Sequence, residues 1–371
     1  MRNQSAELLI EYLLRQSLRY FRGVTSVIVH GSAARREYSV YSDQEQDILL
    51  GNVGLMIITD SPMVDRLIYP SFLRFLRHID RSDFSKMIEK PLILVKPFEI
   101  SLVPRSHLTE GRIAPDIWAF EMVKANRVIY GENLLPLFKT EFGLDAGLKM
   151  TISRLFGLNL SLPLILRADV DSRLNRLVVN YESTKGILGA FEALLTLLGS
   201  YQPSYSERAN LVTQVIGAFS RDLENPEEAT TLFEQASRCK LNPQELESLP
   251  PIELWFKARN LLFACLKIYY SQGYTMDSYW NKPKSHSRIR AFLGFAIHGK
   301  FEPRTLLMSN LAKTSTTLML KHLLSIKPED CQKPSKAVNN HIISDCRYAN
   351  YLHTRGQWHE ITDHLKLITP K

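Results

Sequence analysis

The sequence predicts an α+β domain built on a small mixed sheet, followed by an all-α helical domain. Between residues 24 and 103, short apolar runs of strand length alternate with turn signals. After about residue 145 this alternation ends, and apolar residues recur at helical spacing. A chain of 371 residues is long enough for two domains, which we expect to span residues 1–145 and 146–371.

Composition favours a soluble, cytoplasmic protein. A hydrophobic content of 45% with 23% charged residues is typical of globular proteins, and no run approaches the roughly 18 apolar residues that a membrane span needs. The N-terminus resembles an amphipathic helix rather than a signal peptide. The four cysteines lack the spacing of metal ligands, so we expect free thiols. The formal net charge of +8 allows an anionic partner.

The elements of the first domain follow from periodicity. Residues 5–21 have the spacing of a helix that packs on a sheet. The apolar run Val27-Ile28-Val29 predicts a buried strand, which ends at the Gly31-Ser32 turn, and a helix should begin near Ala33. Further elements are a helix over 61–80 and strands over 48–50, 55–58, 92–95 and 98–103.

The second domain is predicted to be helical. Helices are expected over 173–199 and 252–270, whereas the polar, proline-containing residues 225–251 read as a surface connection. The segment 284–300 is basic and aromatic, and we interpret it as a solvated helix face. No internal repeat or low-complexity tract is present.

Two carboxylates follow the Gly31-Ser32 turn. If the strand over 48–50 begins early enough to include Asp43 and Glu45, the two side chains project to the same side. Mg²⁺ prefers hard oxygen ligands and is usually held by one or two carboxylates together with phosphate oxygens. A glycine-containing turn can present backbone N–H groups to the phosphates. Asp47 lies two residues further on and could assist or substitute.

This stretch resembles the signature of the polymerase-beta-like nucleotidyltransferase superfamily. Residues 31–37, Gly-Ser-Ala-Ala-Arg-Arg-Glu, and residues 42–45, Ser-Asp-Gln-Glu, are similar to the GSxxRxE and SDxD segments of bacterial members. Glu45 departs from the usual aspartate. The segment Arg127 to Glu132 resembles the "vlyGe" segment that follows the last helix of the family's catalytic domain. The resemblance covers about the first 210 residues.

The resemblance implies roles for individual residues. Asp43 and Glu45 would hold Mg²⁺ or Mn²⁺, and Glu99 would be the third carboxylate, which acts on the acceptor hydroxyl. The turn at Gly31 and Ser32 would bind the phosphates. Two cations, Arg35 and Lys185, would contact the triphosphate. Ordinary alternatives remain open: Glu99 as an exposed strand residue, Lys185 as a solvated lysine, and Arg35 in an ion pair with Glu37 or Asp43.

The function implied is a Mg²⁺-dependent enzyme that transfers a nucleoside monophosphate, AMP from ATP by family precedent, to a hydroxyl of a protein or small molecule. A second register remains open, in which Asn52 and Gly54 stand where the metal carboxylates belong, and the chain is a non-catalytic nucleotide-binding or scaffolding homologue. A third alternative is an enzyme that extends an RNA end. The sequence contains no recognisable nucleic-acid-binding module that would favour it.

Overall fold

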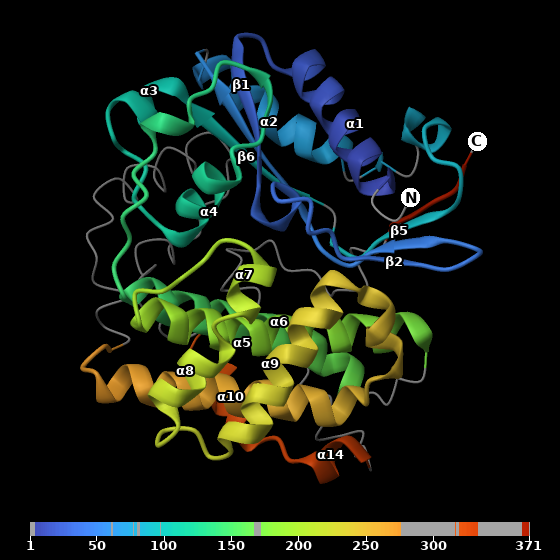
Figure 1. Cartoon of the computed structure of the whole chain (residues 1–371). Helices are drawn as coiled ribbons and strands as arrows, with labels where there is room; N and C mark the ends of the chain where they lie inside the picture. The colour runs from blue at the N-terminus through green and yellow to red at the C-terminus, as the bar shows by residue number, and fades with distance from the viewer. Residues whose placement is uncertain are drawn as a thin grey trace, which may run out of the picture.

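The computed structural model describes residues 4–60, 62–76, 78–79, 82–96, 98–166, 172–275, 316, 319–332 and 366–370. These residues form an α+β structure in which a sheet-containing part lies above a group of long helices in the view of Figure 1. The basic segment 284–300 and Cys346 lie outside the described residues.

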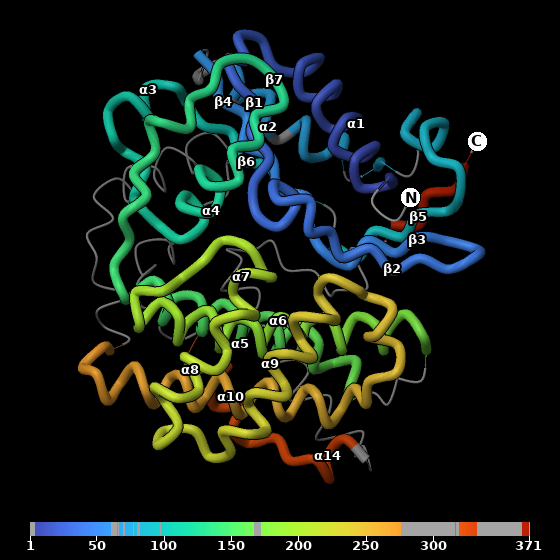
Figure 2. Tube along the Cα trace, viewed as in Figure 1, coloured from blue at the N-terminus to red at the C-terminus, as the bar shows by residue number. Residues whose placement is uncertain are grey.

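The first sheet has the strand order β6-β4-β1-β7. Its strands are β1 (Val24–His30), β4 (Val53–Thr59), β6 (Phe98–Pro104) and β7 (Val128–Gly131). Both β4 and β7 run antiparallel to β1, whereas β6 runs parallel to β4. The end of β1 and the beginnings of β4 and β6 therefore meet at one end of the sheet, and Figure 2 traces the three strands side by side.

The second sheet has the order β2-β3-β5-β8. It consists of the hairpin β2 (Val40–Ser42) and β3 (Asp47–Leu49), then β5 (Leu92–Leu94) and β8 (Lys366–Ile368). Because β8 pairs antiparallel with β5, the C-terminal residues return to the sheet-containing part (Figure 1). The prediction that assigned them to a helical domain therefore does not hold for this strand.

Helices cover both faces of the first sheet. The bounds of these elements are α1 (Gln4–Tyr20), η1 (Gly31–Ala33), α2 (Pro62–Leu76), η3 (Asp83–Lys86), α3 (Arg105–Thr109), α4 (Ile117–Ala125) and η4 (Leu135–Leu137). Successive residues of a strand point to opposite faces. Val27 and Val29 accordingly join the core under α1 and α2, whereas Ile28 packs with Ala119 and Met122 of α4.

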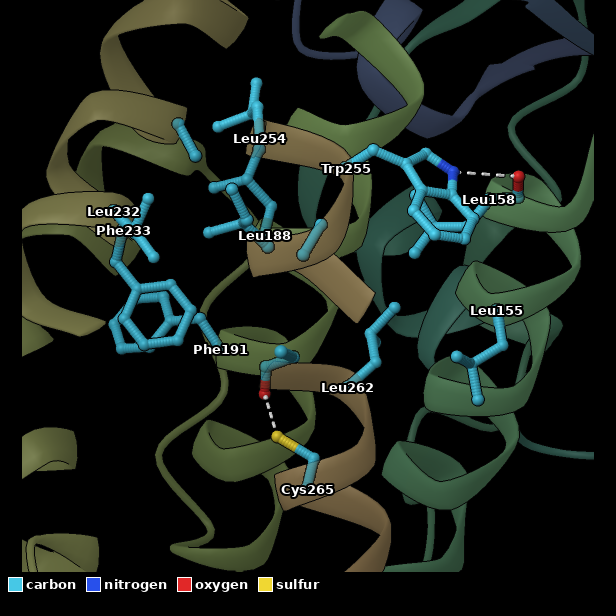
Figure 3. Close-up of a cluster of buried hydrophobic side chains, with 14 of the residues drawn as sticks. Leu155, Leu158, Leu188, Phe191, Leu232, Phe233, Leu254, Trp255, Leu262 and Cys265 are labelled. Carbon is cyan, nitrogen blue, oxygen red and sulfur yellow. Dashed lines mark hydrogen bonds between the residues drawn. The ribbon is translucent and has the colours of Figure 1, made fainter. Parts of the chain in front are cut away.

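The long helices surround α6. Their bounds are α5 (Asp145–Leu166), α6 (Arg173–Leu197), α7 (Tyr205–Ala209), α8 (Val212–Phe219), α9 (Pro226–Leu241), η6 (Pro243–Ser248), α10 (Pro251–Ser271) and α14 (Pro328–Gln332). α6 is buried on nearly every side, because α5, α9 and α10 pack against it. Figure 3 shows the resulting core around Phe191, Phe233 and Trp255. None of the described helices has the length and apolarity required to cross a lipid bilayer.

Two local predictions are wrong. The chain forms one 3₁₀ turn at η1 instead of a helix beginning near Ala33, and Arg36 then adopts a left-handed backbone conformation with φ of 59°. Residues 225–251 are largely helical, because Asn225 caps α9, Pro226 occupies its first turn and Phe233 is fully buried. The expected helices 61–80, 173–199 and 252–270 are confirmed as α2, α6 and α10, with bounds shifted by a few residues.

Candidate functional site

Three strand ends meet beside the Gly31-Ser32 turn. His30 ends β1 and lies opposite Gly54 of β4, which in turn lies opposite Glu99 of β6. Asn52 precedes β4, and its Nδ2 atom donates a hydrogen bond of 2.8 Å to Oε2 of Glu99. A neutral carboxamide, and not a second carboxylate, therefore adjoins Glu99 at this end of the sheet.

His30 fills the space beside Gly54. A Cβ atom built on Gly54 would lie 2.8 Å from Nε2 of the His30 ring, and closer still to Nδ1 and Cε1. Real Cβ contacts are essentially never shorter than 3.0 Å. Burial lowers the pKa of His30, and the nearby Glu99 carboxylate opposes this effect. The ring and the glycine are therefore complementary, and a carboxylate at position 54 requires His30 to move.

The structure separates Asp43 and Glu45 from this end of the sheet. They lie in the turn between β2 and β3, so the prediction that they share one face of a strand is wrong. Oδ1 of Asp43 accepts hydrogen bonds from the backbone N–H groups of Glu45, at 2.8 Å, and Gln46, at 2.7 Å. Its Oδ2 atom pairs with Nη1 of Arg173 at 2.7 Å. This turn lowers the pKa of Asp43, although its partial burial works in the opposite direction.

Asp47 has a structural role in the same hairpin. It is buried on β3, where its carboxylate accepts hydrogen bonds from Ser5 and Ser42 and forms a 2.6 Å ion pair with Lys90. Each carboxylate oxygen is therefore engaged by the protein itself. Asp47 joins the beginning of α1 to the second sheet and does not point to the Gly31-Ser32 turn.

The Gly31-Ser32 turn has the backbone that the sequence suggests. Gly31 has a φ of 68°, and a Cβ atom built on it would meet nothing within 4 Å. The carbonyl oxygen of Ser32 accepts the backbone N–H groups of Arg35 and Glu37. Nε of Arg35 pairs with Glu37 at 2.7 Å, which is one of the ion pairs that the sequence left open. Nη1 of Arg35 pairs with Glu121 of α4 at 3.2 Å.

Arg208 connects this turn to the helices. It is 2% exposed and pairs with Glu192 of α6 and with Glu121 of α4. Its Nη2 atom also donates to the hydroxyl of Tyr201 and to the carbonyl oxygen of Pro203, each at 2.7 Å. A capping box at Ser204 and Glu207 begins α7 and fixes this turn.

A second charged group lies where β6 begins. Nζ of Lys96 pairs with Glu182 of α6 at 2.7 Å, and Lys185 lies one turn further along the same helix. Glu182 also interacts electrostatically with Arg154 of α5. Burial lowers the pKa of Lys185 well below its usual value, and the neighbouring cations Lys96 and Arg154 lower it further against the opposing effect of Glu182.

Lys240 is a buried cation that hydroxyl groups solvate. It is 2% exposed, and its Nζ atom donates to Oγ of Ser39 at 2.8 Å and to the hydroxyl of Tyr181 at 3.0 Å. Burial lowers the pKa of Lys240. The same Tyr181 hydroxyl would lie 3.0 Å from a Cβ atom on Gly51, the residue before Asn52, so this group adjoins the sheet end.

These side chains form one network, which we call the interface cluster. Its charged members are Arg35, Glu37, Lys96, Glu121, Arg154, Glu182, Lys185, Glu192, Arg208 and Lys240. The ring of Tyr205 joins its two halves, since Arg208 and Lys240 lie 4.8 Å and 5.3 Å from the ring centroid. Six basic side chains stand against four carboxylates in the cluster. Because burial lowers the pKa of Lys185 and of Lys240, a neighbouring anion would favour the charged forms of these two lysines.

Sequence reasoning identified part of this site. It selected Gly31, Ser32, Arg35, Glu99 and Lys185, and the structure brings the turn, Arg35 and Lys185 into or beside the interface cluster. It missed Lys96, Glu121, Arg154, Glu192 and Lys240. The available signal was the presence of charged residues on otherwise apolar helices, since such residues are rarely buried unless they are paired.

The described residues contain no group of three or more His, Cys, Asp and Glu side chains arranged to hold a metal ion. At the sheet end, the residues beside Glu99 are Asn52 and Gly54. Comparisons with known protein families, curated proteins and solved structures find nothing that matches this chain.

We expect His30 to prevent a metal site from being created by substitution at positions 52 and 54 alone. Asn52→Asp with Gly54→Asp supplies two carboxylates beside Glu99, but the second collides with the imidazole. Adding His30→Ser should create Mn²⁺ binding, which at one hundred times Kd stabilises the fold by about 2.7 kcal/mol. Calorimetric titration with Mn²⁺, together with thermal unfolding, measures both effects.

The same titration contains its own control. Asp43→Asn in the triple variant should leave Mn²⁺ binding unchanged, because Asp43 lies in the separate hairpin turn. Equal Mn²⁺ affinity in the double and triple variants would show that His30 is no obstacle. Loss of binding upon Asp43→Asn would instead return Asp43 to the metal site.

Proposed function

We propose that this chain is a nucleotidyltransferase-like protein that binds a nucleoside triphosphate and does not transfer its nucleotide. The observation that carries the proposal is the pair His30 and Gly54, in which the imidazole ring occupies the space that a side chain at position 54 would need. In the family that the motif resembles, two carboxylates two residues apart lie next to the strand of the third. Asn52 and Gly54 are likewise two residues apart and lie beside Glu99 of β6.

The two buried lysines of the interface cluster, Lys185 and Lys240, support an anionic ligand, because a bound anion would favour their charged forms. A triphosphate carries several negative charges, which Mg²⁺ ordinarily helps to neutralise. Within the described part of the chain, Lys185 forms no close ion pair, although Glu182 interacts with it electrostatically, and Lys240 contacts hydroxyl groups instead of a carboxylate. A phosphate group near these two lysines would raise their lowered pKa values and favour their charged forms, whereas Lys96 already pairs with Glu182.

Binding should not require a divalent metal. We expect ATP to bind with similar affinity in EDTA and in excess Mg²⁺, since protein cations neutralise the phosphates. Lys185→Met should weaken binding about tenfold to a hundredfold, the usual range for a hydrogen bond to a charged group. Isothermal titration calorimetry with each variant measures the change.

Lys267→Met is the matched control, because Lys267 is an exposed lysine on α10 and its loss changes the net charge equally. It should leave the affinity unchanged. A tenfold or greater gain in affinity with Mg²⁺, or equal weakening by the two substitutions, would contradict the proposal.

Labelled nucleotide distinguishes this function from transfer. We expect no label on protein, small molecules or RNA after incubation of the chain with labelled ATP, cell extract and Mg²⁺ or Mn²⁺. Label that is transferred, and then lost with Asp43→Asn, would support the enzyme that uses Asp43, Glu45 and Glu99. Label found on RNA would support the RNA-end alternative. Glu99→Gln tests the enzyme alternative further. If transfer occurs and Glu99 is catalytic, this substitution should lower the transfer rate by about 10² to 10⁴.

A further inference from the structure

Trp118 is a large aromatic side chain on the surface beside the Gly31-Ser32 turn. It belongs to the first turn of α4, which packs against β1 and η1, and it is 36% exposed. Its ring centroid lies 6.3 Å from that of His30, the residue before Gly31, and 6.2 Å from that of Phe138. The indole thus has two aromatic neighbours, while part of its surface remains open to solvent.

The position of Trp118 on α4 relates it to the interface cluster. Residues three apart on a helix lie on the same side, so Trp118 neighbours Glu121, which pairs with Arg35 and Arg208. Glu121 also acts electrostatically on His30, where it opposes the lowering of the His30 pKa by burial. An apolar, planar surface therefore adjoins both the turn and the charged cluster.

From this juxtaposition we infer that Trp118 is the stacking surface for the base of the bound nucleotide. The inference rests on the proposed function, because Trp118 would bind the base of the same nucleotide whose phosphates the lysines would bind. A base and an indole ring stack through their π faces, and this interaction tolerates different bases. His30 and Phe138 limit the movement of the ring, which lowers the entropy lost when a base stacks on it.

Two ligands separate the base from the phosphates. Trp118→Ala should weaken ATP binding about tenfold, the scale of a lost base–aromatic stack. It should leave the affinity for inorganic tripolyphosphate, which has no base, unchanged. Trp118→Phe should recover most of the ATP affinity, since a smaller ring still stacks. Calorimetry with the full-length chain gives each affinity.

Fluorescence adds a direct signal. ATP should quench the emission of the wild-type chain more strongly than that of Trp118→Phe, whereas tripolyphosphate should quench both equally. The emission that remains in Trp118→Phe comes from Trp255, Trp280 and Trp358, so the difference between the two chains reports on Trp118.

The outcomes are distinct. If Trp118→Ala binds ATP as tightly as the wild type, the stacking assignment is overturned while triphosphate binding stands. Equal weakening of ATP and tripolyphosphate would also overturn it, because the ring would then act through the fold. If the wild-type chain binds neither ligand, the proposed function itself fails.

Discussion

We expect Arg208→Ala to lower the free energy of unfolding by about 3 kcal/mol. Removing one partner of a buried ion pair typically costs about 3–5 kcal/mol, because the remaining charge stays buried without compensation. Arg208 is 2% exposed and pairs with Glu192 and Glu121. Arg154 and Arg35 remain near these two carboxylates, which places the expected cost at the lower end of the range.

The loss should depend on pH in a defined direction. Burial alone would raise the pKa of Glu121, but Arg208 and Arg35 hold it below the ordinary value of 4.5. A carboxylate with a lowered pKa stabilises the fold above its unfolded-state pKa, and this contribution disappears as the pH falls through the folded-state pKa. The difference between wild type and Arg208→Ala should therefore be largest near neutral pH and shrink in acid.

Urea denaturation at pH 7 and pH 4 measures this difference. Arg238→Ala is a suitable control, because the Arg238 side chain is 61% exposed and its 3.6 Å pair with Glu245 is a surface contact. Such a pair contributes at most about 1 kcal/mol. If Arg208→Ala were no more destabilising than Arg238→Ala, the interface cluster would not hold the fold together.

Trp255→Ala should destabilise the chain by about 3–5 kcal/mol, the range for removing a large aromatic side chain from a core. Trp255 is fully buried on α10, and its Nε1 atom donates a 3.1 Å hydrogen bond to the carbonyl oxygen of Leu158 on α5 (Figure 3). The substitution leaves a cavity between these helices. Because no ligand is needed for this effect, it tests the helical packing independently of function.

Thermal and urea unfolding of the variant give the size of the effect. Tyr270→Ala is the control on the same helix, since Tyr270 is 42% exposed and its loss creates no enclosed cavity. We expect a change within about 0.5 kcal/mol for it. Comparable losses in the two variants would contradict the arrangement of α10 against α5.

The sequence alone predicted features that depend only on residues close together along the chain. The apolar runs located β1, β4 and β6, and helical spacing located α6 and α10. The turn at Gly31 was also predicted, and its φ of 68° is a conformation that glycine adopts without strain. These features were accessible because strand and helix periods and left-handed turns are properties of a few consecutive residues.

The sequence could not choose between two pairs of residues as neighbours of Glu99. Asp43 and Glu45 have the motif spacing from Gly31-Ser32, yet Asn52 and Gly54 adjoin Glu99 in the folded chain. The hairpin of β2 and β3 removes the first pair by building a separate sheet. Local spacing is the same whether that hairpin forms or not, so only the pairing of β4 with β1 and β6 decides the neighbours.

The interface cluster was hidden for the same reason. Arg208 meets Glu121 across 87 residues, and Lys240 meets Ser39 across 201. A charged residue on a helix has the same appearance in the sequence whether it faces solvent or a distant partner. What the sequence determined is therefore where the strands, helices and turns form, because these depend on short-range sterics and periodicity. What the tertiary structure decided is which side chains share the site, because long-range strand register and the packing of α4, α6 and α9 bring them together.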